Sequence, residues 1–155
     1  MKASQTSFRF PLLGFTPDPN LGEFGYVFPD LDSLTVCRAY TLKLGMPDGL
    51  ELVDAGGARW KVRAVEKVRR YGPLASWLIA ATLNWQRYLV DYDLEPLPAM
   101  TLAEVKDRVC AEVQVFGDLD DYNEEHEAET AARITRIRSA KTIAQVAELT
   151  EWEGF

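Results

Sequence analysis

The residues best placed to do chemistry are the acidic side chains of one segment, which runs from Glu112 to Glu129 and contains no Lys or Arg. Residues 1–100 hold eleven basic and eleven acidic side chains, so the net charge of −7 comes entirely from residues 101–155. A surface with one sign of charge attracts a partner of the opposite sign. This segment, called the acidic run below, therefore predicts a docking surface for a basic protein. A solvated loop that maintains solubility is the alternative interpretation.

The expected contact surface lies in the middle of the acidic run. Tyr122 is the expected apolar anchor, and the carboxylates around it would steer the partner during encounter. Glu112 and residues 91–95 are expected to extend the surface. The predicted partner-binding residues are Asp118, Asp120, Asp121, Tyr122, Glu124 and Glu125.

The acidic run also has a partial likeness to a calcium-binding loop. Asp118, Asp120 and Glu129 occupy positions 1, 3 and 12 of such a loop. Positions 5 and 6 are Tyr122 and Asn123, where the loop needs an oxygen ligand and then Gly. The spacing therefore does not predict a calcium site.

Other residue types that could support catalysis or metal binding are isolated. His126 is the single histidine, whereas a zinc site usually combines several His or Cys ligands at recognisable spacing. Cys37 and Cys110 are far apart in sequence, and we expect two reduced, buried thiols. No serine lies in a nucleophile motif. We predict no catalytic residue, no metal and no cofactor.

Length and composition predict one domain over residues 1–155, since 47% of the residues are hydrophobic and 11% are aromatic. The N-terminal residues do not resemble a secretory signal, so a cytoplasmic location is expected. The longest uncharged stretch, residues 71–86, is too short to span a membrane, and no membrane partner is expected. An acidic pI of about 4.8 argues against nucleic acid as the partner. The oligomeric state is left open.

The first half of the chain has the pattern of a β-sheet. Residues 1–32 are rich in Pro, Gly and aromatic residues, which predicts loops or edge strands. Residues 33–70 are expected to form the sheet, with a strand over 34–44 and a hairpin over 50–65. Gly56 or Gly57 is expected to have the positive φ that the tight hairpin turn requires, and Trp60 is expected to be buried.

Residues 74–150 have the spacing of about four helices. An apolar stripe at helical spacing covers residues 74–89, and a second begins at Thr101, which forms a predicted capping box with Glu104. Two further helices are expected over 128–138 and 142–149. The order of elements predicts an α+β fold, in which a small antiparallel sheet in the N-terminal half packs against about four C-terminal helices.

The hairpin of residues 50–62, followed by helices in a small acidic protein without catalytic motifs, resembles bacterial immunity proteins. These proteins bind and neutralise a cognate toxin that competing cells deliver. The resemblance implies a non-enzymatic protein that covers the basic surface of a toxin, and it assigns no individual residue. The alternative hypothesis is a small enzyme or ligand-binding domain with a pocket between sheet and helices, lined by Trp60, Trp77 or Trp85.

Overall fold

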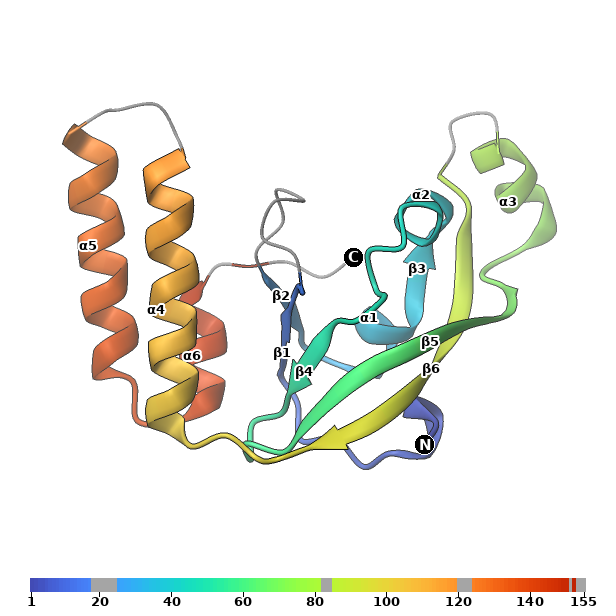
Figure 1. The fold of residues 1–155 in the computed structure, drawn as a ribbon. Coiled ribbons are helices and arrows are strands. Elements are labelled where there is room, and N and C mark those ends of the chain that lie inside the picture. The colour runs from blue at the N-terminus through green and yellow to red at the C-terminus, as the bar shows by residue number, and fades with distance from the viewer. Residues whose placement is uncertain (18–24, 82–84, 120–123, 151, 153–155) are drawn as a thin grey trace.

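A computed structural model describes residues 1–17, 25–81, 85–119, 124–150 and 152 (Figure 1). The strands are β1 Leu12–Phe15, β2 Gly25–Phe28, β3 Val36–Arg38, β4 Glu51–Val53, β5 Arg59–Arg70 and β6 Arg87–Leu97. The helices are α1 Leu31–Thr35, α2 Ala39–Lys43, α3 Leu74–Ala81, α4 Leu102–Leu119, α5 Glu124–Ser139 and α6 Ile143–Thr150, with a short 3-10 helix, η1, over Ala3–Gln5.

The six strands form one curled sheet in the order β2-β1-β4-β5-β6-β3, and every neighbouring pair is antiparallel. Strands β5 and β6 are much the longest, with 12 and 11 residues. They extend well beyond β4, which pairs with residues 59–61 of β5, whereas β3 pairs with residues 87–89 at the far end of β6. Helix α3 connects the far ends of β5 and β6 (Figure 1). The α+β class predicted from the sequence is confirmed.

Hydrophobic cores lie on both faces of the sheet, because successive side chains of a strand point to opposite faces. Leu12 packs in the core that contains Trp60 and Tyr92, whereas its neighbour Leu13 packs against the helical layer. That helical layer consists of α4, α5 and α6 (Figure 1). The central strands are therefore covered on both sides.

The hairpin between β4 and β5 forms as predicted. Gly57 has a φ of +85°, and a Cβ atom there would lie 2.3 Å from the Met100 carbonyl oxygen, so only glycine fits. The Asp54 carboxylate accepts hydrogen bonds from the backbone N–H groups of Gly56 and Ala58 at 2.8 and 2.9 Å, which holds the turn closed. Trp60 is buried, with Phe8 packed edge-on against its ring.

The strand predicted over residues 34–44 is wrong. Helix α1 precedes the three-residue strand β3, and α2 follows it. The Asp30 carboxylate caps α1 by accepting a hydrogen bond from the Ser33 N–H at 2.7 Å, and this local cap starts a helical turn where the period-two pattern favoured a strand. Tyr40 and Leu44, expected on the buried face, are exposed.

The long helix predicted over residues 74–89 is also wrong in its second half. Helix α3 ends at Ala81, and residues 87–97 form β6, which pairs with β5 along nearly its whole length. The alternation of buried Val90, Tyr92 and Leu94 is the strand pattern that the helical interpretation overlooked. Trp85, whose ring was expected in the core, is exposed.

The C-terminal helices follow the predicted pattern. The capping box at α4 is present: Glu104 Oε2 accepts hydrogen bonds from the Thr101 N–H at 2.7 Å and the Thr101 hydroxyl at 2.8 Å. Val105, Val109 and Val113 form the buried stripe of α4, although the helix continues to Leu119 instead of ending at Gly117. Both cysteines are free and buried. Among the described residues, no helix combines the length and the apolar character needed to cross a membrane.

Candidate functional site

The described part of the predicted contact surface lies at one end of the helical layer. Asp118 belongs to the last turn of α4, and Glu124 and Glu125 are the first residues of α5. Asp120, Asp121 and Tyr122 lie outside the described residues, as do the side chains of the other three. Their joint surface therefore stays a prediction.

The backbone of α4 and α5 brings both parts of the acidic run together. The two helices are antiparallel neighbours, so the end of α4 and the start of α5 meet at the same end of this pair (Figure 1). Glu127 and Glu129 on α5 are exposed. Residues 91–95, expected as an extension, lie on β6 instead, where Asp91 binds Ser4 and Glu95 pairs with Arg63.

Glu112 belongs to the acidic run but faces the sheet. Arg108 lies one turn earlier on α4, and its guanidinium packs 4.2 Å from the centre of the Phe15 ring. Arg108 Nη1 lies 2.6 Å from Glu51 Oε2 on β4, and its Nε lies 3.6 Å from Glu112 Oε1. Arg59 also binds the Glu51 carboxylate, at 2.5 Å. These four charged residues join α4 to the sheet.

The two carboxylates of this cluster have opposite pKa shifts. Burial alone would raise the pKa of Glu51, but hydrogen bonds from Arg108 and Arg59 outweigh it and hold that pKa below its ordinary value. Burial raises the pKa of Glu112 to about 7, and the positive charge of Arg108 only partly opposes this rise. Glu112 Oε2 is buried and has no hydrogen-bond partner in the described part of the chain. Glu112 is therefore a titrating structural group near neutral pH.

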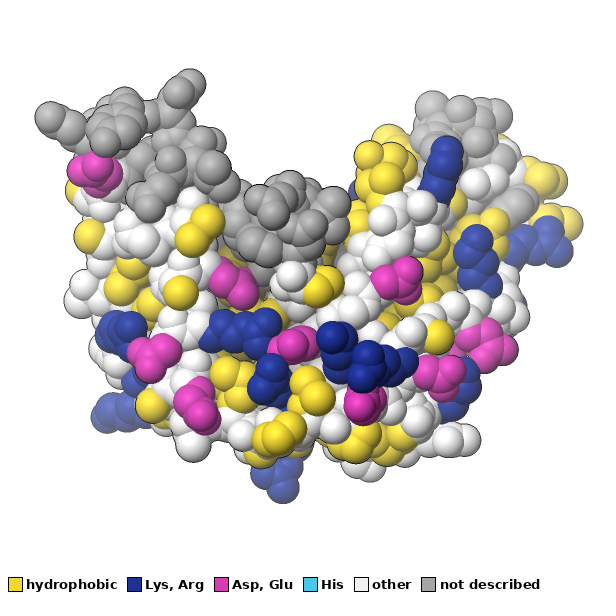
Figure 2. All heavy atoms as spheres, viewed as in Figure 1, with side chains coloured by type: hydrophobic (Ala, Val, Ile, Leu, Met, Phe, Trp, Pro, Cys, Tyr) yellow, Lys and Arg dark blue, Asp and Glu magenta, His cyan; other side chains and the backbone are white. Residues whose placement is uncertain are grey.

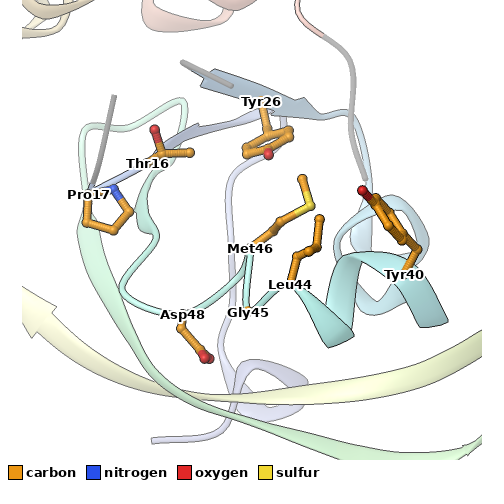
Figure 3. A pocket seen from close by; sticks show the side chains of 8 residues that line it. All are labelled: Thr16, Pro17, Tyr26, Tyr40, Leu44, Gly45, Met46 and Asp48. Carbon is orange, nitrogen blue, oxygen red and sulfur yellow. The ribbon is translucent and has the colours of Figure 1, made fainter. Parts of the chain in front are cut away.

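A pocket of about 240 Å³ opens beside α2, at the other side of the sheet from the helical layer (Figure 3). Tyr26, Tyr40, Leu44 and Met46 surround the same space, and the Asp48 carboxylate lies apart from them. The remaining lining residues are Thr16, Pro17 and Gly45. The lining contains no nucleophile paired with a base, so its chemistry is that of a site for a small, largely apolar molecule.

Two of the three tryptophans named by the alternative hypothesis, Trp60 and Trp85, are not among the described residues that line the pocket beside α2. Trp60 is buried in the core and Trp85 is exposed, whereas the side chain of Trp77 lies outside the described part. Within the described residues, no group of three or more His, Cys, Asp or Glu side chains could hold a metal ion.

The buried thiol of Cys37 is not a reactive nucleophile. Its Sγ lies 3.1 Å from the hydroxyl oxygen of Tyr92, which donates a hydrogen bond to the Leu34 carbonyl at 2.8 Å. Burial raises the pKa of Cys37 to about 11, so the thiol stays protonated at neutral pH. This contact stabilises the core and offers no group for covalent catalysis.

A feature that the sequence interpretation missed is the end of the β5–β6 pair together with α3, which we call the arm (residues 67–81 and 85–89). Eleven large hydrophobic side chains are exposed in the described chain, and six of them lie on the arm: Val68, Tyr71, Leu74, Leu78, Ile79 and Trp85. Ile79 is 70% exposed and Trp85 is 65% exposed. Hydrophobic and basic side chains lie next to each other at this end of the molecule (Figure 2). A cluster of this kind marks an interaction surface.

The charges of the arm differ from those at its base. At the base, Arg59 binds Glu51 and Arg63 binds Glu95, so these cations have acidic partners. Between Lys67 and Val90 the sequence contains four basic residues and no acidic one. The four are Lys67, Arg69, Arg70 and Arg87. The arm therefore carries a local positive charge within a chain of net negative charge.

The signal that could have identified the arm was present in the sequence. The uncharged residues 71–86 are bounded by Arg69 and Arg70 on one side and Arg87 on the other. The apolar residues also fit a buried helix, and the cations also fit a solvated strand face. Only the pairing of β5 with β6 at this end of the sheet brings the two flanking segments together (Figure 1).

No family model matches the chain, and searches among curated proteins and solved structures found no significant similarity. The function must therefore be inferred from the surfaces described above.

Proposed function

We propose that this protein is a non-enzymatic binding protein of the immunity type, which acts in the cytoplasm by neutralising a toxin domain with a basic surface. The observation that carries the proposal is the acidic run, with its eight acidic and no basic side chains. Its contact surface would centre on Asp118, Asp120, Asp121, Tyr122, Glu124 and Glu125. Tyr122 is the proposed anchor, and the carboxylates form the steering rim.

The placement of these charges on the helices supports a role in binding. Acidic residues at the start of a helix interact favourably with its dipole, which applies to Glu124 and Glu125 on α5. At the end of a helix the same charge is unfavourable, yet Asp118 lies in the last turn of α4, which contains no basic residue. Asp120 and Asp121 follow directly in the sequence. Charges that oppose local stability are expected where function requires them.

The test compares two variants that lose the same amount of charge. The first replaces Asp118, Asp120 and Asp121 by Asn; the matched control carries Asp32→Asn, Asp48→Asn and Glu148→Gln, which are exposed acidic residues outside the acidic run. The proposal requires a neighbouring gene for a secreted protein with a C-terminal toxin domain. Each variant is co-expressed with that domain, and cell growth and association rate are measured. We expect the first variant to associate more slowly and with a weaker salt dependence, because rim charges act mainly on encounter.

Two results would contradict the proposal. One is the absence of growth protection by the wild-type protein. The other is equal association of the first variant and the control with the toxin domain at low ionic strength. Tyr122→Ala provides a separate measurement, since loss of a desolvated anchor should raise the dissociation rate without slowing association.

A further inference from the structure

The arm exposes a helix that is apolar on every described side. Leu74, Ala75, Leu78 and Ile79 of α3 are all exposed, and Ser76 is the one polar residue of this helix. A helix without a polar face is normally buried, either in a protein core or in a membrane. A protein groove covers one stripe of a helix and leaves the opposite face in water. The composition of α3 therefore favours a surrounding apolar medium over a groove.

The residues that flank α3 have a fixed chemical order along the chain. Moving outward from the apolar helix α3 in both directions along the chain, the first aromatic residues are Tyr71 before it and Trp85 after it. Beyond these aromatic residues lie the cations Lys67, Arg69 and Arg87, with Arg70 beside Tyr71. The same order occurs across the surface of an anionic bilayer, where acyl chains are followed by the interfacial zone that Trp and Tyr prefer and then by phosphate groups.

We propose that the arm docks this protein on an anionic lipid bilayer, with α3 inserted at the boundary between headgroups and acyl chains. The eight residues of α3 span about 12 Å, well below the roughly 30 Å of a hydrocarbon core, so insertion is from one side. Lys67, Arg69 and Arg87 bind the lipid phosphates. This inference does not depend on the proposed toxin partner.

The net charge of −7 does not prevent this docking. Charges are screened over about 8–10 Å at physiological salt, so the bilayer responds to the nearest residues. Figure 1 shows the arm and the acidic end of the α4–α5 pair at the right and left ends of the upper edge of the molecule. Repulsion of the acidic run by lipid phosphates therefore favours a tilted orientation in which the arm makes contact.

A second copy of the chain is a less suitable partner for the arm. A symmetric dimer buries the same surface of both subunits against itself. Pairing two arms would bring Lys67, Arg69 and Arg87 of one copy close to the same three cations of the other, and the sequence between Lys67 and Val90 contains no acidic residue. Like charges at an interface oppose association. Lipid phosphates supply the compensating charge that a second arm lacks.

The experiment measures co-sedimentation of the whole protein with phosphatidylcholine vesicles that contain phosphatidylglycerol, and with vesicles of phosphatidylcholine alone. Leu74→Gln with Leu78→Gln tests insertion, and the matched control is Leu31→Gln with Leu44→Gln, which changes two exposed leucines outside the arm. All four side chains are between 41% and 54% exposed, so folding should be unaffected, which circular dichroism verifies. We expect the first pair to weaken vesicle binding more than about tenfold and the control to leave it unchanged.

The charge contribution is tested by Lys67→Gln, Arg69→Gln and Arg87→Gln together. At about 1 kcal/mol for each cation near an anionic surface, binding to the phosphatidylglycerol vesicles should fall by about 100-fold. The matched control carries Lys43→Gln, Arg136→Gln and Lys141→Gln, which removes three exposed cations elsewhere. That control should bind as the wild type does.

Insertion has its own spectroscopic readout. Brominated acyl chains should quench the fluorescence of Trp85, so Trp85→Phe should reduce quenching, whereas Trp152→Phe, outside the arm, should not.

Equal binding to both vesicle types, or equal binding of arm and control variants, would overturn the proposal. Sedimentation equilibrium without lipid supplies a third decisive result. A dimer that Leu74→Gln with Leu78→Gln converts to a monomer would show that the arm binds a second copy instead.

Discussion

The arm and the acidic run are opposites in charge and in the way each is supported. Between Lys67 and Val90 every charged residue is basic, and between Glu112 and Glu129 every charged residue is acidic. The acidic run includes the end of α4 and the start of α5. Helix α4 is anchored to the core by its buried residues Val105, Val109 and Val113. The arm is the end of the β5–β6 pair, where β3 pairs with residues 87–89 of β6, and its described apolar side chains are largely in solvent.

This difference shows that charge and burial are distributed independently in the chain. The acidic run lies on helices with a buried face, so its charges add a surface property to a stable element. In the arm the apolar residues form the exposed surface, and they contribute little to the core. Substitutions should therefore affect stability strongly in the body of the sheet and weakly in the arm.

The largest expected effect separates two tryptophans. Trp60 is buried between the sheet and Phe8, and Trp60→Ala should lower the free energy of unfolding by about 3–5 kcal/mol through cavity formation and lost burial. Trp85 on the arm is exposed, and Trp85→Ala should change the free energy of unfolding by less than about 0.5 kcal/mol. Urea unfolding monitored by far-ultraviolet circular dichroism measures both. Equal losses would contradict the distinction between the arm and the body of the sheet.

A smaller effect is expected from Glu112, where the acidic run meets the sheet. Its folded-state pKa of about 7 lies above the ordinary value of 4.5. Between these two values the unfolded chain releases this proton and the folded protein retains it, so stability falls as the pH rises. The free energy of unfolding falls by at most about 3 kcal/mol, and the fall is complete once the pH exceeds the pKa of Glu112 in the folded protein.

Glu112→Gln removes this titration, because a neutral amide replaces the carboxyl group. The free energy of unfolding of the wild type, measured in urea from pH 4 to pH 8, should decline relative to that of the variant. The matched control is Glu148→Gln, whose side chain is exposed on α6 and should leave the pH dependence unchanged. Parallel curves for wild type and Glu112→Gln would show that folding leaves the pKa of Glu112 unchanged.

An effect of about 1 kcal/mol is expected at the start of α4, the helix that carries the first part of the acidic run. Thr101→Ala removes the hydroxyl that accepts a hydrogen bond from the Glu104 N–H at 3.3 Å, and such caps contribute about 1 kcal/mol. Thr135→Ala within α5 serves as the control, since Thr135 is exposed inside a helix, where alanine is favourable. Thermal unfolding should show a lower midpoint for the first variant alone.

The smallest expected effect is that of calcium on the acidic run. Positions 5 and 6 of the partial loop, Tyr122 and Asn123, lack the ligand and the glycine that calcium loops require. The unfolding midpoint should therefore be the same with millimolar calcium and with EDTA, because an ion that does not bind the native state cannot stabilise it. A rise of several degrees with calcium would make the acidic run a metal site.

The sequence alone determined the features whose causes are local. The Asp54–Gly57 turn follows from a glycine at positive φ and a carboxylate that binds the turn. The start of α4 follows from the Thr101–Glu104 box, and its buried face follows from valines at helical spacing. The separation of acidic and basic segments is likewise a property of the sequence. For these features, neighbouring residues contain all the information that the structure uses.

Only the tertiary structure decided the features that depend on distant partners. Residues 87–97 are compatible with both a helical and an alternating pattern, and their pairing with β5 selects the strand because the backbone groups of β5 need partners. The apolar residues of α3 would be buried in most folds. They are exposed here because the pairing of β5 with β6 places α3 at the end of the sheet, outside the two hydrophobic cores, a consequence of strand pairing that no local pattern encodes.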